Sequence, residues 1–199
     1  MASKTDIANR ALTKLGEDRI TDLLDDTERA RTLNSMYAMC RDAELRAHVW
    51  NFAIKRASLP RLAQLPAFGY DFQYQLPSDL VRVIQINEWW YWWGGADYYG
   101  GNNAEYQIEG RMILSNFNGP MPIRYVASVD DPGLYDSLFV EAFACRLAME
   151  ACERLTQSNT KLQALQQQYI AAIRQAVRAD AVENPPESLP DESWMLSRI

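Results

Sequence analysis

The segment LFVEAFACRLAMEAC, residues 138–152, predicts the element around which the rest of the chain packs. Its apolar side chains occupy nearly the whole circumference of a helix, which is typical of a helix that is buried on all sides. They are Leu138, Phe139, Ala142, Phe143, Cys145, Leu147, Ala148, Met149 and Cys152. Asp130-Asp131-Pro132-Gly133 precedes the segment and Ser158-Asn159-Thr160 follows it, and both are helix-breaking sequences. We therefore predict a central buried helix between them.

Three more helices are predicted, each with one apolar face. Ser3 and Asp6 have the spacing of a capping box, and Gly16 is placed to end a helix over residues 3–16. A second helix begins near Asp26-Thr27 and runs to about Ala47. The last helix follows residue 160 and presents Leu162, Leu165, Tyr169, Ile173, Ala176 and Val177 on one face.

Residues 50–128 have a different pattern of short runs in near alternation, separated by proline and glycine. Glu109-Gly110-Arg111 indicates a tight hairpin turn between two of these runs. We predict an α+β fold: a four-helix bundle from 1–49 and 129–182, an inserted antiparallel β subdomain over 50–128, and an extended C-terminal tail over 183–199. The tail contains three prolines and shows no periodicity.

The composition excludes several classes of protein. The chain has 199 residues, a net charge of −6 and a pI of about 4.9. It has no cluster of Lys and Arg of the kind that grips nucleic acid. Its three cysteines form no CxxC pair. No apolar run approaches membrane-spanning length, and no signal peptide is evident. We expect a reduced, cytoplasmic, soluble protein.

No motif in the sequence predicts catalysis. His48 is the one histidine, and no second histidine or cysteine cluster completes a metal site around it, so a structural or interface role is expected. The three cysteines are expected to be small buried side chains. GGADYYGGNN, residues 94–103, is neither a GxGxxG motif nor a phosphate-binding loop. Carboxylate pairs such as Asp25-Asp26 do not exclude a glycosidase site, but nothing in the sequence specifically supports one. We expect no catalytic residue, no cofactor and no metal.

Two apolar segments require a partner. NEWWYWWGG, residues 87–95, contains Trp89, Trp90, Tyr91, Trp92 and Trp93, and is followed by Tyr98 and Tyr99. Five such rings would expose about 750–1,250 Å², more than the roughly 300–600 Å² that a monomer usually tolerates. The tail carries Leu189, Trp194, Met195, Leu196, Arg198 and Ile199 beyond its prolines, as a docking peptide does. The alternative for the tail is that it folds back onto its own bundle.

Five segments, taken in order, resemble the head-to-tail adaptor proteins of tailed bacteriophages, of the tail tubular protein A type. They are IANRALTKLGEDRI (7–20), YAMCRDAELRAHVWNFAIKRASL (37–59), LPSDLVRVIQI (76–86), YQIEGRMILSN (106–116) and IRYVASVDDPGLYDSLFVEAFACRLAMEAC (123–152). The similarity covers residues 7–180. The family usually has a proline after the histidine of the second segment, where this chain has Val49.

The resemblance implies an assembly function without catalysis. Proteins of this family form a ring, typically dodecameric, beneath the portal protein of the filled capsid. The ring extends the DNA channel without sequence-specific DNA binding and offers a docking platform for a distal tail, nozzle or tail-completion protein. The C-terminal segment of such proteins reaches the portal, which assigns Leu189–Ile199 to portal binding. The implied location is the head–tail neck of the virion, after assembly in the host cytoplasm, with no membrane contact.

Other interpretations remain open from the sequence. The aromatic loop, which contains Trp89–Trp93, Tyr98 and Tyr99, could belong to a binding module for carbohydrate. Against this, consecutive rings in a strand alternate between two faces. It could also anchor the protein at a membrane interface, where Trp and Tyr are favoured. The third alternative is an enzyme whose site has no recognisable motif.

Overall fold

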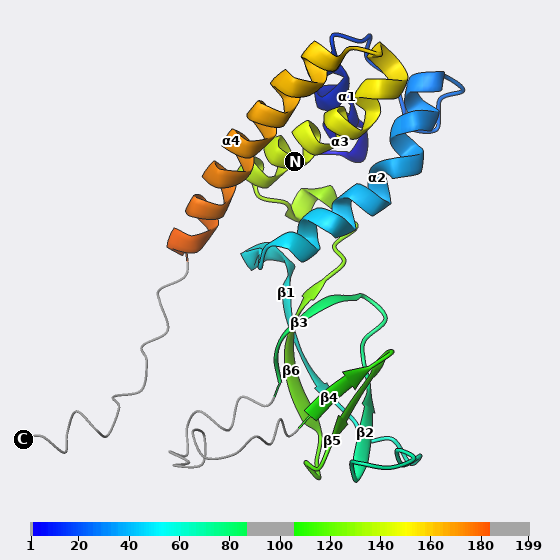
Figure 1. The fold of residues 1–199 in the computed structure, drawn as a ribbon, viewed down its shortest axis with the longest axis vertical. Coiled ribbons are helices and arrows are strands. Elements are labelled where there is room, and N and C mark those ends of the chain that lie inside the picture. The colour runs from blue at the N-terminus through cyan, green and yellow to red at the C-terminus, as the bar shows by residue number, and fades with distance from the viewer. Residues whose placement is uncertain (1, 87–105, 184–199) are drawn as a thin grey trace, which may run out of the picture. The chain divides into compact units, whose positions relative to one another are not determined.

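The computed structural model describes residues 2–86 and 106–183 of the chain (Figure 1). The elements in chain order are α1 (Lys4–Leu15), α2 (Glu28–Ala47), the 3-10 turn η1 (Asn51–Ala53), β1 (Ile54–Leu59), β2 (Phe72–Gln75), β3 (Leu80–Ile86), β4 (Tyr106–Glu109), β5 (Met112–Ser115), β6 (Met121–Ala127), the 3-10 turn η4 (Pro132–Leu134), α3 (Ser137–Thr156) and α4 (Asn159–Glu183). The predicted α+β class is confirmed: two N-terminal and two C-terminal helices pack together, and two small three-stranded antiparallel sheets are inserted between them.

The described residues fall into two compact units. The helical unit comprises the chain up to Ile54 and from Val126 onward, and the β unit lies within Lys55–Tyr125. The helical unit is therefore built from two segments that are distant in sequence. In it, α3 packs against α1, α2 and α4. The central position predicted for this helix is confirmed.

Both ends of α1 carry the predicted capping signals. The Ser3 hydroxyl accepts a hydrogen bond from the Asp6 backbone N–H at 3.0 Å, and the Asp6 carboxylate accepts one from the Ser3 N–H at 3.0 Å. Gly16 ends the helix in the left-handed conformation, with φ at 70°. Lys161 of α4 donates to the Leu15 carbonyl oxygen, so a second helix stabilises this C-terminus.

The core of the helical unit is centred on Phe139, which is fully buried. Its ring centroid lies 5.0 Å from those of Trp50 and Phe52, 5.2 Å from that of Tyr135 and 5.9 Å from that of Phe143. Most of these pairs meet edge to face, which is a favoured geometry for aromatic rings. The Trp50 indole N–H donates to the Glu44 carbonyl oxygen at 3.0 Å. The buried tryptophan thus has its polar atom satisfied.

The segment around Trp50 differs from the prediction. The run that starts at residue 50 was expected to be a strand, but Asn51–Ala53 form the 3-10 turn η1 and the strand begins at Ile54. Trp50 and Phe52 both pack against Phe139 of α3, and the Ala53 backbone N–H donates to the Trp50 carbonyl oxygen at 3.0 Å, so these residues close a turn before the strand begins.

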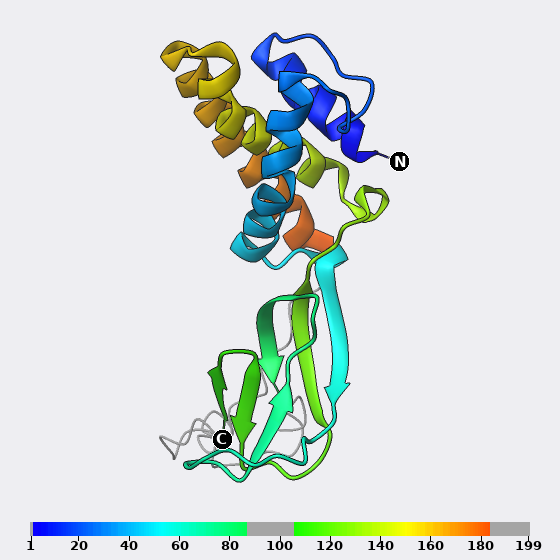
Figure 2. The same ribbon diagram turned by 90° about the vertical axis from the view of Figure 1, so that its right-hand side faces the viewer.

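The β unit contains two sheets with the strand orders β1-β6-β3 and β2-β5-β4. Figure 2 shows the long strands β1 and β6 running side by side. The strands β4 and β5 form the predicted hairpin, in which Glu109 faces Met112 and Gly110 takes a φ of 58°. Tyr74 of β2 is fully buried, and its hydroxyl donates to the Phe117 carbonyl oxygen.

Candidate functional site

The two segments predicted to bind partners lie outside the described residues. These are the aromatic loop, with Trp89–Trp93, Tyr98 and Tyr99, and the portal-binding tail, Leu189–Ile199. The structure does describe the elements next to them in sequence. The strand β3 ends at Ile86, β4 begins at Tyr106 and α4 ends at Glu183.

The C-terminal end of α4 is held by a set of hydrogen bonds that we call the α4 clamp, formed by His48, Asn51 and Asp180. The Asp180 side-chain carboxylate accepts a hydrogen bond from the Asn51 backbone N–H at 2.9 Å. The Asn51 side-chain amide donates to the Asp180 carbonyl oxygen at 2.7 Å. His48 Nε2 lies 3.3 Å from the second carboxylate oxygen of Asp180. The clamp gives His48 a structural contact and fixes the end of α4 near the point where the tail begins.

A second polar contact joins α2 to α4 within the helical unit. The Tyr169 hydroxyl donates to the Glu44 carboxylate, with oxygen–oxygen distances of 2.8 and 3.1 Å. Burial raises the pKa of Glu44 above its ordinary value, although the Tyr169 hydrogen bond and the charge of Arg146 oppose this shift. Burial likewise raises the pKa of Tyr169 to about 12. The pair is a half-buried hydrogen bond in the packing of two helices.

A third polar cluster surrounds Arg41, whose side chain is largely buried. Its guanidinium donates to Asp42 at 2.9 Å and to the Ser128 hydroxyl at 3.1 Å, and it pairs with Asp130. The Lys4 ammonium also contacts Asp130, at 2.7 Å. The hydrogen bond from Lys4, together with the charge of Arg41, lowers the pKa of Asp130 below its ordinary value. These contacts connect α1 and α2 to the segment before α3.

The cysteines have the properties of buried structural side chains, as predicted. Cys40, Cys145 and Cys152 are all buried. Burial raises the pKa of the Cys40 thiol to about 11 and also raises that of Cys145, so both thiols are protonated at neutral pH. Within residues 2–86 and 106–183, no group of three His, Cys, Asp or Glu side chains is arranged to hold a metal ion. None of the helices in these ranges is long and apolar enough to span a membrane.

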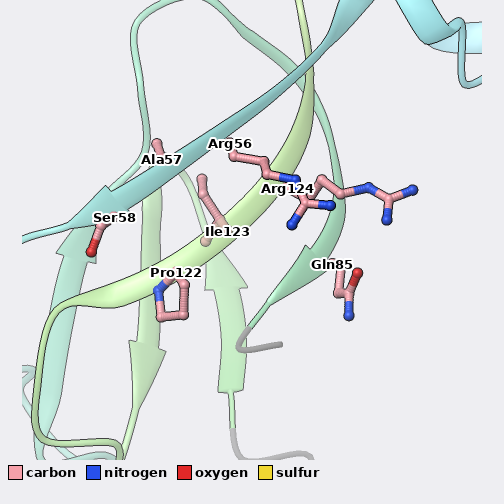
Figure 3. Close-up of a pocket in the computed structure, with 7 residues that line it drawn as sticks. All are labelled: Arg56, Ala57, Ser58, Gln85, Pro122, Ile123 and Arg124. Carbon is pink, nitrogen blue, oxygen red and sulfur yellow. The ribbon is translucent and has the colours of Figure 1, made fainter. Parts of the chain in front are cut away.

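The β unit contains a pocket of about 320 Å³ that the sequence did not predict (Figure 3). We call it the arginine pocket. Its lining residues come from three strands of one sheet and are Arg56, Ala57 and Ser58 of β1, Gln85 of β3, and Pro122, Ile123 and Arg124 of β6. Figure 3 shows that the side chains of Arg56 and Arg124 run in the same direction. Guanidinium groups and apolar side chains that line one pocket suit a ligand that carries both a carboxylate and an aliphatic group.

Large apolar side chains are exposed on both units. On the helical unit, Leu24 is 82% exposed in the loop between α1 and α2. On the β unit, Leu65 and Phe68 are 63% and 87% exposed in the loop between β1 and β2. Single exposed apolar residues are common on protein surfaces, but two in one loop form a small contact surface.

Sequence reasoning missed the arginine pocket because its two charged residues lie on strands that are distant in sequence. The alternation around Arg56 and Arg124 indicates two strands, but it does not indicate that these strands are neighbours. The pairing of β1 with β6 is visible only in the folded chain.

No protein-family model matches this sequence, and no curated protein matches it either.

Proposed function

We propose that this chain is a structural head-to-tail adaptor of a tailed bacteriophage. In this proposal it forms a dodecameric ring between the portal and the tail, extends the DNA channel, and offers a docking platform for a distal tail protein. The ordered resemblance of five segments to such adaptors suggests the function.

The structural observation that carries the proposal is the exposure of large apolar side chains on two different units. Leu24 belongs to the helical unit, whereas Leu65 and Phe68 belong to the β unit. A ring built from head-to-tail contacts needs two different surfaces on each subunit, because each subunit contacts one neighbour with one surface and the other neighbour with the second. The exposed side chains supply apolar contact area on both units, which supports the proposal.

The α4 clamp supports the part of the proposal that concerns the portal. A docking peptide binds more tightly when less conformational freedom is lost on binding. The hydrogen bonds between Asp180 and Asn51 hold the end of α4, the last element before the tail in sequence. We propose that Leu189–Ile199 bind the portal from this starting point.

The direct test is to mix the purified protein with the cognate portal and to examine the product by electron microscopy and native mass spectrometry. The expected product is a ring of the chain on the portal. The proposal fails if the chain neither binds the portal nor forms a ring. Binding to carbohydrate or to lipid vesicles in place of the portal would favour an aromatic-loop binding module.

A second experiment isolates the tail. Deletion of residues 189–199 is expected to abolish portal binding while the melting temperature stays nearly unchanged. A variant in which residues 189–199 are scrambled serves as the matched control, because it keeps the composition and length but loses the order of the anchor side chains. A fall of many degrees in the melting temperature of the deletion variant would instead assign the tail to the core of its own subunit.

A further inference from the structure

The arginine pocket has the chemistry of a site for an acidic peptide. Arg56 is exposed and Arg124 is half-buried, and both line the same pocket. Each guanidinium carries five N–H donors in a planar fork, so a contact within the chain still leaves donors for a carboxylate. Alternate residues of a strand point to the same face, which places the Ser58 hydroxyl on the face of Arg56. Pro122, two positions before Arg124 on β6, lies on the same face as Arg124 and provides apolar surface beside these polar groups.

A segment with the complementary chemistry lies on the helical unit. We call it the acidic loop, residues 20–27, which joins α1 to α2 and has the sequence ITDLLDDT. At its tip Leu24 is 82% exposed, and the side chain of Asp26 is 93% exposed. Among the described residues, Asp26 forms an ion pair with Arg31, whose side chain is also exposed. The loop therefore presents an aliphatic side chain next to a carboxylate.

The acidic loop is held in shape by its own hydrogen bonds. The Asp25 carboxylate accepts from the backbone N–H groups of Thr21 and Asp22, at 2.8 and 2.9 Å. The Asp22 carboxylate accepts from the Leu24 N–H at 2.8 Å. A loop that is ordered before it binds loses less conformational entropy on binding. Asp22 and Asp25 therefore shape the loop, which leaves Leu24 and Asp26 to make contacts.

We infer that the arginine pocket of one copy of this chain binds the acidic loop of a second copy. In this contact Leu24 packs on Pro122, and the Asp26 carboxylate pairs with the guanidinium groups of Arg56 and Arg124. The inference rests on the proposed ring, because it names the two different surfaces that a head-to-tail contact requires. The chain carries a net charge of −6, so two copies repel one another at long range. A local pairing of opposite charges at the contact therefore specifies the orientation in which the copies bind.

The test uses two full-length variants, Arg56→Glu and Asp26→Arg, alone and mixed. Each variant alone brings like charges together at the contact, so its self-association is expected to weaken about tenfold or more. In the mixture, the Asp26→Arg loop of one variant faces the Arg56→Glu pocket of the other, so opposite charges meet again. The unchanged loop of the pocket variant likewise faces the unchanged pocket of the loop variant. Association is therefore expected to return to nearly the wild-type level. Sedimentation equilibrium and native mass spectrometry measure it.

Two matched controls change the same charges elsewhere. The first control is Arg82→Glu. Arg82 is on β3 of the same sheet, three positions before Gln85, so its side chain is on the opposite face from that of Gln85. Glu153→Arg replaces an exposed acid on α3. Neither control is expected to weaken association, and mixing the two is expected to change nothing. Leu24→Asp provides an independent test of the loop and is expected to weaken association without a change in the thermal melt.

The outcomes separate this inference from the proposed ring function. If the wild-type chain forms rings on the portal, and the charge-reversed variants form them equally well, the inference is wrong and the proposed function stands. If no ring forms on the portal, but the two reversed variants associate only when mixed, the inference stands and the proposed function fails. If the wild-type chain neither self-associates at its highest soluble concentration nor forms rings, both are overturned.

Discussion

Asp180, near the end of the last helix, accepts a hydrogen bond at 2.9 Å from the backbone N–H of Asn51, which lies 129 positions earlier in the chain. The Asn51 side chain returns a hydrogen bond to the Asp180 carbonyl oxygen. Asp180 is 9% exposed, so water cannot easily replace these partners. The contact joins the N-terminal segment of the helical unit, which ends at Ile54, to its C-terminal segment, which begins at Val126. Asn51 lies only a few residues before the first residue of the β unit, Lys55.

The first prediction concerns this contact. Asp180→Ala is expected to reduce the free energy of unfolding by about 1–3 kcal/mol, because the Asn51 N–H loses its acceptor in a half-buried position. Urea denaturation followed by circular dichroism measures the change. Glu183→Ala, one turn further along α4 and exposed, is the control and is expected to change the stability by less than about 0.5 kcal/mol. Equal effects of the two substitutions would show that the clamp does not stabilise the fold.

The second prediction concerns the pH dependence of stability at Glu44. Burial raises the pKa of this carboxyl in the folded state above its ordinary value of 4.5, so the folded protein keeps a proton that the unfolded chain releases. The contribution of Glu44 to stability is therefore complete below the unfolded pKa and is lost as the pH rises through the folded pKa. Glu44→Gln remains neutral at every pH. Its stability relative to the wild type is expected to increase as the pH rises from about 4 to about 7.

Unfolding free energies of the two proteins at a series of pH values check this expectation. Glu153→Gln, which changes an exposed glutamate on α3, is the matched control. A difference between Glu44→Gln and the wild type that stays constant across this range would contradict the prediction. It would mean that the Tyr169 hydrogen bond and the Arg146 charge fully compensate the burial of Glu44.

The third prediction concerns the aromatic loop. Replacement of both Trp90 and Trp92 by alanine is expected to weaken ring or tail assembly more than it lowers the stability of the subunit, because several large rings together supply apolar contact area. Trp50→Ala is a comparison with the opposite expected result. Trp50 is fully buried in the helical core, so its removal is expected to cost about 3–5 kcal/mol of stability. A loss of stability of that size in the Trp90 and Trp92 variant would assign the loop to the subunit's own core.

The helices were predictable from local signals. The Ser3 and Asp6 capping box, the left-handed Gly16 and the Thr27 N-cap of α2 all depend on residues within one turn of the helix end. The end of α3 was harder to predict from the sequence. Gln157 takes the left-handed conformation there, with φ at 48°, and glycine is the residue that usually takes it. The breaker sequence that follows it still placed the boundary between α3 and α4 correctly.

The contacts between distant segments were not predictable. The turn at Asn51–Ala53 depends on the packing of Trp50 against Phe139, and the arginine pocket depends on the pairing of β1 with β6. In both cases the local pattern is compatible with several partners, and the partner is fixed only by the three-dimensional packing of the chain. The predicted aromatic loop and portal-binding tail lie outside the described residues and stay predictions.

The assembly of the helical unit from two separated segments has a consequence for synthesis on the ribosome. The apolar faces of α1 and α2 are made first, but α3, which covers them, follows only after Lys55–Tyr125 have been translated. At roughly 5–20 residues per second, those faces remain uncovered for several seconds. The order of synthesis therefore leaves α1 and α2 without the helix that packs against both of them until most of the chain has been made.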